Sequence, residues 1–127
     1  MDREPVLYVL MRTDLASMNP GKACAQATHA ANQCVAQGRD VAKLLEEWAA
    51  DRGFGTCIVL GVPGPEMMVE AVHAARAAGV HAGVTHDPSY PLRDGNFTHL
   101  IPLDTCAYLF GERFAVAPLV SGLELLP

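Results

Sequence analysis

The chain has 127 residues, of which 50% are hydrophobic and 18% are charged. This length predicts one domain over residues 1–127 with a single buried core, and the composition excludes an intrinsically disordered chain. The net charge of −5 argues against a broadly basic surface for nucleic acid, but it is compatible with a local basic site.

The cellular location is predicted by looking for membrane-spanning segments and for a signal peptide in the sequence. No apolar run approaches the roughly 20 residues of a membrane-spanning helix. The sequence begins Met-Asp-Arg-Glu-Pro, which is charged and unlike the apolar segment of a secretory signal peptide. We therefore expect a cytoplasmic protein with no membrane partner. Without a Cys-x-x-Cys pair, buried free thiols are expected at Cys24, Cys34, Cys57 and Cys106.

The first half of the chain contains two apolar strand-like runs and two helical segments. Residues 5–11 are continuously apolar, which is typical of a strand covered on both faces. After a polar loop, Asn19 is a suitable N-cap and Pro20 a suitable first residue for a helix that extends to about residue 37. A second helix is expected over residues 40–53 and a second buried strand over residues 56–62.

The second half continues the alternation of strands and helices. A third helix is expected over residues 66–78, a third strand over 80–85 and a fourth strand over 105–110. The proline-containing segment 87–104 is predicted to be a long loop, and loops of this length are often functional. A short helical stretch follows Gly111. This alternation predicts an α/β domain with a largely parallel sheet and helices on both faces.

The first helix carries one narrow polar line, formed by Lys22, Gln26, His29 and Gln33 at helical spacing. We expect this line to be exposed in a cleft and the small residues of the opposite face to pack on the sheet. The same pattern also fits an ordinary solvated helix face, and the spacing alone does not decide between the two. The expected inner face consists of Ala23, Cys24, Ala27, Ala30, Ala31 and Cys34.

A run of residues in a characteristic order and spacing covers the loop and the start of this helix. It consists of Arg12-Thr13-Asp14-Leu15, Met18, Gly21-Lys22, Ala25-Gln26 and His29-Ala30. This run resembles the signature of the type II peptidyl-tRNA hydrolases, the archaeal and eukaryotic type. A looser resemblance extends over nearly the whole chain. We therefore expect a three-layer α/β/α sandwich with a four-stranded mixed, mostly parallel sheet.

The resemblance implies hydrolysis of the ester between a peptide and the 3′ end of tRNA, with peptidyl-tRNA as the partner. The candidate catalytic residues are then Asp87 as base or water-orienting group, Lys22 for a phosphate or oxyanion, and Thr105 for water or a ribose hydroxyl. Thr105 reaches the same edge as Asp87 only if the fourth strand runs antiparallel to the third. His29 is a further catalytic candidate, as a proton carrier. We expect no cofactor and no metal, because the histidines match no ligand spacing.

The candidate substrate-binding residues are Gln26, Arg12 and Ser89. The chain departs from the family where Pro88-Ser89-Tyr90-Pro91 follows Asp87 in place of Ala-Gly, and where Asp104 replaces a glycine. These departures keep two alternatives open. One is a binding or regulatory module without activity, and the other is a hydrolase of another small ester or amide. The oligomeric state is also open, with a homodimer as one expectation.

Overall fold

The sheet has four strands, and most of its strand pairs are antiparallel. The computed structural model describes residues 4–127, so residues 1–3 of the charged N-terminal stretch lie outside the described part. The strands are β1 (Pro5–Arg12), β2 (Cys57–Val62), β3 (His81–Asp94) and β4 (Phe97–Glu112). Their order is β2-β1-β4-β3, in which β1 and β2 are parallel and the other two pairs are antiparallel.

The expected mostly parallel sheet is therefore wrong, whereas the mixed four-stranded sheet is confirmed. The physical reason is the connection between β3 and β4. A parallel neighbour would need a crossover segment, usually a helix, but β3 and β4 are joined directly by a tight turn. The antiparallel course of β4 also brings the start of its buried half beside the middle of β3, which carries Asp87.

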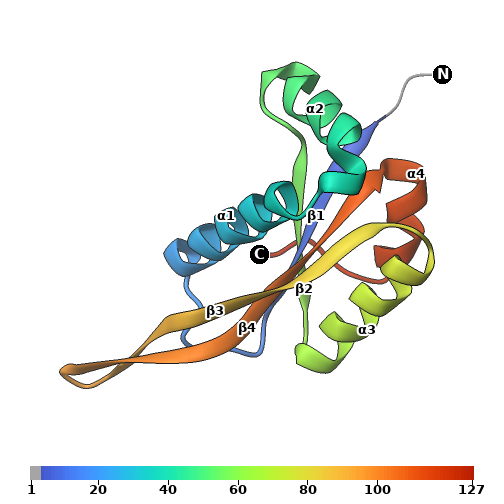
Figure 1. Cartoon of the computed structure of the whole chain (residues 1–127). Helices are drawn as coiled ribbons and strands as arrows, with labels where there is room; N and C mark the ends of the chain where they lie inside the picture. Colours follow the sequence, from blue (N-terminus) through green and yellow to red (C-terminus); the bar gives the residue numbers. More distant parts are fainter. Residues whose placement is uncertain (1–3) are drawn as a thin grey trace.

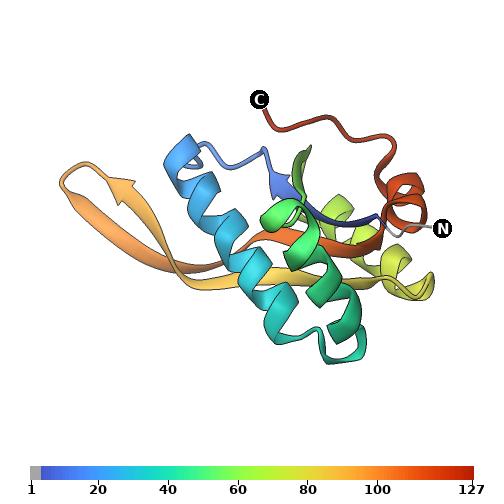
Figure 2. The same cartoon turned by 90° about the horizontal axis from the view of Figure 1, so that it is seen from above.

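Helices cover both faces of the sheet (Figures 1 and 2). The longest, α1 (Pro20–Ala36), lies on one face together with α2 (Ala42–Ala50). The other face is covered by α3 (Pro65–Ala77) and the short α4 (Arg113–Val116). The side chain of Asn19 caps α1 by accepting a hydrogen bond from the Lys22 N–H at 2.8 Å, as the sequence predicts.

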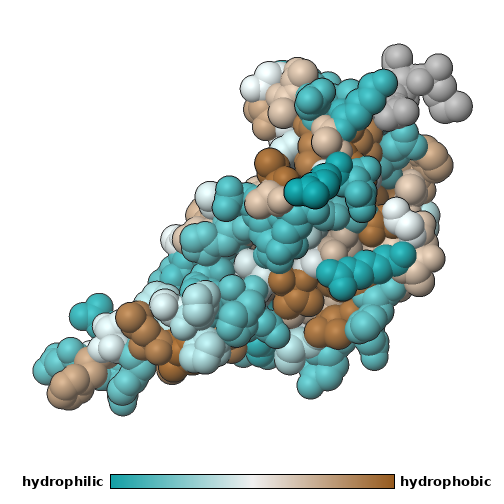
Figure 3. All heavy atoms as spheres, in the orientation of Figure 1, coloured by the Kyte–Doolittle hydropathy of each residue, from teal (hydrophilic) through white to brown (hydrophobic). Residues whose placement is uncertain are grey.

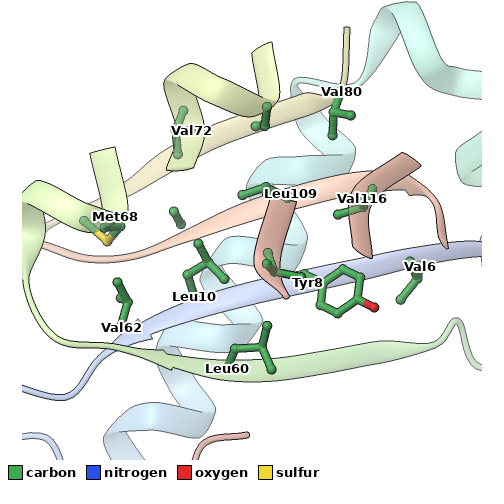
Figure 4. Packing of buried hydrophobic residues seen from close by; sticks show 14 residues of the cluster. Val6, Tyr8, Leu10, Leu60, Val62, Met68, Val72, Val80, Leu109 and Val116 are labelled. Carbon is green, nitrogen blue, oxygen red and sulfur yellow. The ribbon is translucent and has the colours of Figure 1, made fainter. Parts of the chain in front are cut away.

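Strand β1 supplies side chains to both halves of the core because neighbouring residues of a strand point to opposite faces. Its even-numbered members pack against α3 and are seen in Figure 4. Its odd-numbered members pack against α1 and α2. All are fully or almost fully buried: Val6, Tyr8 and Leu10 on the first side, and Leu7, Val9 and Met11 on the second.

The predicted loop 87–104 is instead the outer half of the β3–β4 hairpin, so this prediction is wrong. The hairpin projects beyond the helices as an arm (Figure 1) and turns at Gly95, whose φ of 59° favours glycine. Apolar side chains are exposed among polar ones on this arm (Figure 3), including Phe97 and Leu100. No helix among residues 4–127 is both long and apolar enough to span a membrane.

Two irregularities in the pairing of β3 with β4 shape the region that carries the candidate residues. Thr85 pairs with Cys106 and His86 with Asp104, so Thr105 is an extra residue on β4. Further out, β3 also has an extra residue between Asp87 and Tyr90. Bulges of this kind redirect side chains. Here Thr105 and the neighbouring Cys106 both contact α1, which a regular strand would not allow.

The cysteine prediction is confirmed only in part. All four thiols are free, but Cys24 and Cys57 are exposed, whereas Cys34 and Cys106 are buried. Cys24 therefore does not belong to the packed face of α1. Burial raises the pKa of the Cys34 thiol to about 12, so this thiol stays protonated and unreactive.

Candidate active site

The polar line of α1 faces β3 and is hydrogen-bonded to it at three places, which together we call the α1–β3 seam. The line keeps its register because its members recur every three or four residues, while the strand runs in the opposite direction along the helix. The Lys22 ammonium donates to the Pro91 carbonyl at 2.7 Å, and the Gln26 amide donates to the Asp87 carboxylate at 2.7 Å. The third bond runs from the Gln33 amide to the Val84 carbonyl at 2.9 Å.

Gln26 is buried, with an exposed fraction of only 3%, so the expectation that it is exposed in a cleft is wrong. Its Nε2 donates to Asp87 Oδ2 at 2.7 Å, and its Oε1 accepts from the Thr105 hydroxyl at 2.7 Å. An ionised carboxylate only accepts hydrogen bonds, so the amide orientation is fixed by its partners. The result is a continuous chain of hydrogen bonds from Thr105 through Gln26 to Asp87.

The Asp87 carboxylate is held by two donors. Besides Gln26, the Ser89 N–H donates to Asp87 Oδ1 at 2.8 Å, which is the bond of a turn that aspartate forms with its own backbone. Burial raises the pKa of Asp87, but these two hydrogen bonds and the nearby His29 and His86 lower it more. The net pKa lies below the ordinary value, and Asp87 is therefore ionised at neutral pH.

The turn after Asp87 is formed by Pro88 and Ser89, where the resemblance leads one to expect Ala-Gly. The bulge at Pro88 and Ser89 lets the backbone N–H of Ser89 reach back to the carboxylate. Ser89 thus contacts Asp87 through its backbone, while its side chain lies on the exposed surface. The turn engages only Oδ1 of Asp87, and Oδ2 is bound by Gln26.

Lys22 lies at the first turn of α1 and is attached to the same strand as Asp87. Its ammonium donates to the Pro91 carbonyl at 2.7 Å and lies 5.1 Å from the centre of the Tyr90 ring. Tyr90 is fully buried and exchanges a hydrogen bond of 2.9 Å with Ser17. An ammonium has three donors, so two remain for a ligand. The cation is thus positioned by an uncharged carbonyl and a ring.

Arg12 and His29 occupy different surroundings. The Arg12 guanidinium donates to both carboxylate oxygens of Asp14, at 2.9 and 2.7 Å, and to the Asp104 carbonyl at 3.0 Å. Only 11% of the Arg12 side chain is exposed, and its bond to the Asp104 carbonyl links β1 to the residue next to the bulge at Thr105. His29 is exposed, and its charge contributes to lowering the pKa of Asp87.

The sequence analysis missed three contributors to this region: the Tyr90 ring, the Pro91 carbonyl and the Thr85 hydroxyl. A signal for the first two was present in Asp94-Gly95-Asn96, a turn sequence flanked by strand-forming residues. A hairpin predicted there would have placed Tyr90 on a strand.

Hollows of different chemical character border α1. A polar cleft of about 450 Å³ opens along the seam next to Asp87. An apolar hollow of about 370 Å³ lies between α1, Val59 of β2 and the C-terminal residues. Within residues 4–127, no three potential metal-ligating side chains are grouped together.

The comparison with protein families supplies the identity of the chain. Residues 5–101 match the family model described as peptidyl-tRNA hydrolase PTH2. The match includes Lys22, Gln26 and Asp87 and ends before Thr105. Among curated proteins, no match to the chain is found. Because the matched residues make up well over half of the chain, the protein belongs to the PTH2 family and has the function of that family, peptidyl-tRNA hydrolysis, which is the cleavage of a carboxylic ester.

Proposed function

We propose that the α1–β3 seam is the active site for peptidyl-tRNA hydrolysis, with Asp87, Lys22 and His29 as its catalytic group. Thr105, a catalytic candidate in the sequence, is fully buried and takes a positioning role through Gln26. The observation that carries this proposal is the hydrogen-bond chain from Thr105 through the buried Gln26 to Asp87. Such a chain fixes a carboxylate in one orientation, which suits a group that must position a water molecule.

In the proposed reaction, the oxygen of a water molecule attacks the ester carbonyl carbon. The bond from this carbon to the 3′ oxygen of the ribose breaks, and its electron pair stays on that oxygen. One proton of the water ends on the 3′ oxygen, and the remaining hydroxyl stays on the acyl carbon. The products are a peptide with a free carboxylic acid and a tRNA with a free 3′ hydroxyl.

Asp87 serves in this reaction as the group that orients the water. A carboxylate with a lowered pKa is a weak proton acceptor near neutral pH, but it accepts hydrogen bonds strongly. Each of its oxygens keeps about one free acceptor site beside the bonds from Gln26 and Ser89. His29, exposed on the same side of the helix, is proposed to carry the proton towards the 3′ oxygen.

Lys22 is proposed to neutralise negative charge that develops on the ester carbonyl oxygen or that resides on the nearest phosphate. Its position at the N-terminus of α1 adds the favourable helix dipole to the ammonium charge. Gln26 takes a positioning role in this proposal, because both ends of its amide are engaged inside the protein. Arg12 and Ser89 also position their neighbours, through Asp104 and Asp87 respectively.

The experiment is the release of the peptide from N-acetylated aminoacyl-tRNA by the purified protein and by Asp87→Asn. The variant keeps the size of the side chain but removes the negative charge, and we expect a rate loss of about a hundredfold or more. An uncharged substitution of comparable size away from the seam, Asp51→Asn, is the matched control. Full activity of Asp87→Asn would remove Asp87 from the mechanism.

Two further measurements test the alternatives considered from the sequence: equilibrium binding of peptidyl-tRNA, and cleavage of simple esters and amides. An unaltered protein that binds peptidyl-tRNA without cleaving it would be a binding module. One that cleaves only simple esters or amides would be a different hydrolase. A homodimer and a cytoplasmic location stay predictions, the first measured by sedimentation and the second by cell fractionation.

A further inference from the structure

The α1–β3 seam is open on one side of Asp87. Between the Gln26–Asp87 bond and the Gln33–Val84 bond, no hydrogen bond of the seam closes the space beside His29. The polar cleft of about 450 Å³ lies at this position. Its volume is within the range of pockets that bind small ligands. The polar side chains that line it include His29, Asn32, Gln33, Thr85, His86 and Asp87.

Thr85 gives this cleft a hydroxyl without a strong partner. It is 4% exposed and lines the cleft, and apart from a weak interaction with the Cys106 thiol its Oγ1 is the only buried side-chain nitrogen or oxygen in residues 4–127 without a hydrogen-bond partner. A buried hydroxyl left unpaired costs free energy, so such a group calls for an explanation. A ligand that donates to or accepts from Thr85 would remove this cost when it binds.

The chemistry of the lining favours a neutral ligand with amide groups. Asn32 carries both donors and acceptors, and Gln33 offers its amide oxygen as an acceptor, because its Nε2 is bonded to Val84 and Gln37. The imidazole of His29 can donate or accept, and so can Nε2 of His86, whose Nδ1 is bonded to Asp104. Asp87 is the only carboxylate of the lining, and neither lysine nor arginine contributes to it, so a phosphate finds no cation there. The lining also lacks the Phe, Tyr or Trp ring that stacks on a nucleobase in many RNA sites.

The order of groups along the seam assigns the two halves of the substrate to opposite sides of Asp87. Lys22 lies one helical turn before Gln26, on the side of the hairpin arm. The cleft lies on the other side, towards Gln33. An anionic group is therefore best bound beside Lys22, and a neutral amide-containing group is best bound in the cleft.

We infer that the cleft beside Thr85 binds the peptidyl part of the substrate, namely the backbone amide groups next to the ester. The Thr85 hydroxyl bonds one of these amide groups, and the tRNA part lies on the Lys22 side. This inference rests on the proposed function of the seam, and it adds which part of the substrate occupies which side of Asp87.

The test measures how much the peptide contributes to binding. Two RNAs are compared in equilibrium binding: deacylated tRNA, and a non-hydrolysable peptidyl-tRNA in which an amide replaces the ester. Thr85→Val keeps the side-chain shape and removes the hydroxyl. We expect it to weaken binding of the peptidyl-tRNA analogue by about threefold to tenfold, as for the loss of one hydrogen bond, and to leave the affinity for deacylated tRNA unchanged. Thr28→Val makes the same change on the exposed side of α1 and is the matched control.

A stability measurement accompanies the binding assay. Because the Thr85 hydroxyl has no partner in the free protein stronger than the Cys106 thiol, Thr85→Val should change the denaturant midpoint little. An equal loss of affinity for both RNAs would assign the cleft to RNA and overturn the inference, as would unchanged affinity for both. Hydrolysis is measured separately: an inactive unaltered protein that shows Thr85-dependent peptide binding would refute the catalytic proposal and support the peptide subsite.

Discussion

The hydrogen bond from Thr105 to Gln26 can be removed by a single substitution, Thr105→Val, that keeps the shape of the side chain. Thr105 is fully buried, Gln26 is 3% exposed, and the bond between them is 2.7 Å long. Its loss leaves the side-chain oxygen of Gln26, Oε1, buried without a donor, which costs about 1–3 kcal/mol of folding free energy. We expect the free energy of unfolding in urea to fall by this amount.

The same substitution should lower the rate of hydrolysis. Without the Thr105 hydroxyl, the Gln26 amide can rotate, and its Nε2 no longer donates steadily to Asp87 Oδ2. We expect kcat for N-acetylated aminoacyl-tRNA to fall by roughly tenfold to a hundredfold, with a smaller change in KM, because positioning is lost rather than substrate contact.

The pH dependence of the rate and of the stability provides a second test of the hydrogen-bond chain from Thr105 to Asp87. The hydrogen bond from Gln26 lowers the pKa of Asp87, so weakening it raises that pKa. The acidic limb of the rate profile should then move to higher pH in Thr105→Val. A lowered carboxylate pKa also stabilises the fold above the unfolded-state value of about 3.8, and this contribution is lost as the pH falls through the folded-state pKa. The variant should lose less stability on acidification.

Thr105→Ser is the control, because it retains the hydroxyl and should keep both the rate and the acidic limb close to those of the unaltered protein. Full activity of Thr105→Val with an unchanged acidic limb would show that the hydrogen-bond chain takes no part in catalysis. Equal losses in Thr105→Ser and Thr105→Val would show that packing of the methyl group, and not the hydroxyl, is responsible.

Two further predictions concern α1. Lys22→Ala should lower the rate of hydrolysis by about a hundredfold or more. If Lys22 contacts a phosphate of the single-stranded 3′ end, the slope of log affinity against log salt concentration should also become shallower by about 0.7, and Lys22→Arg should keep that slope. An unchanged rate and slope in Lys22→Ala would contradict the role of the ammonium. Ala30→Leu should destabilise the fold by about 1–3 kcal/mol in denaturant, because Ala30 is fully buried, and the exposed Ala25→Leu should have little effect; the reverse order would mean that α1 packs with a different face.

The elements with strong local signals could be predicted from the sequence. The apolar run at residues 5–11 and the Asn19-Pro20 start of α1 both correspond to what the structure has. The outer hairpin was missed because Pro88, Pro91 and Pro102 suggested a loop. Proline is nevertheless tolerated in strands that have a free edge, and beyond the body of the sheet both strands of the arm have one.

The candidate site shows a similar division between local and long-range information. Helical spacing put Lys22 and Gln26 on one line, and this much follows from the sequence. The burial of Gln26 could not be predicted, because it depends on which strand the line faces. Likewise, the contact of Thr105 with α1 depends on a bulge in the pairing with β3, and no local pattern in the sequence reveals that extra residue.

The acidic net charge is compatible with binding of tRNA at the seam, because the cation of the seam, Lys22, is held by uncharged groups. Asp104, which replaces a glycine of the family pattern, lies 2.8 Å from His86, and Asp14 is paired with Arg12. Lys22, in contrast, is positioned by the Pro91 carbonyl and the Tyr90 ring, neither of which cancels its charge. The seam therefore presents an unneutralised cation one helical turn from the Gln26–Asp87 pair, at the position where the proposed mechanism places an anionic group of the RNA.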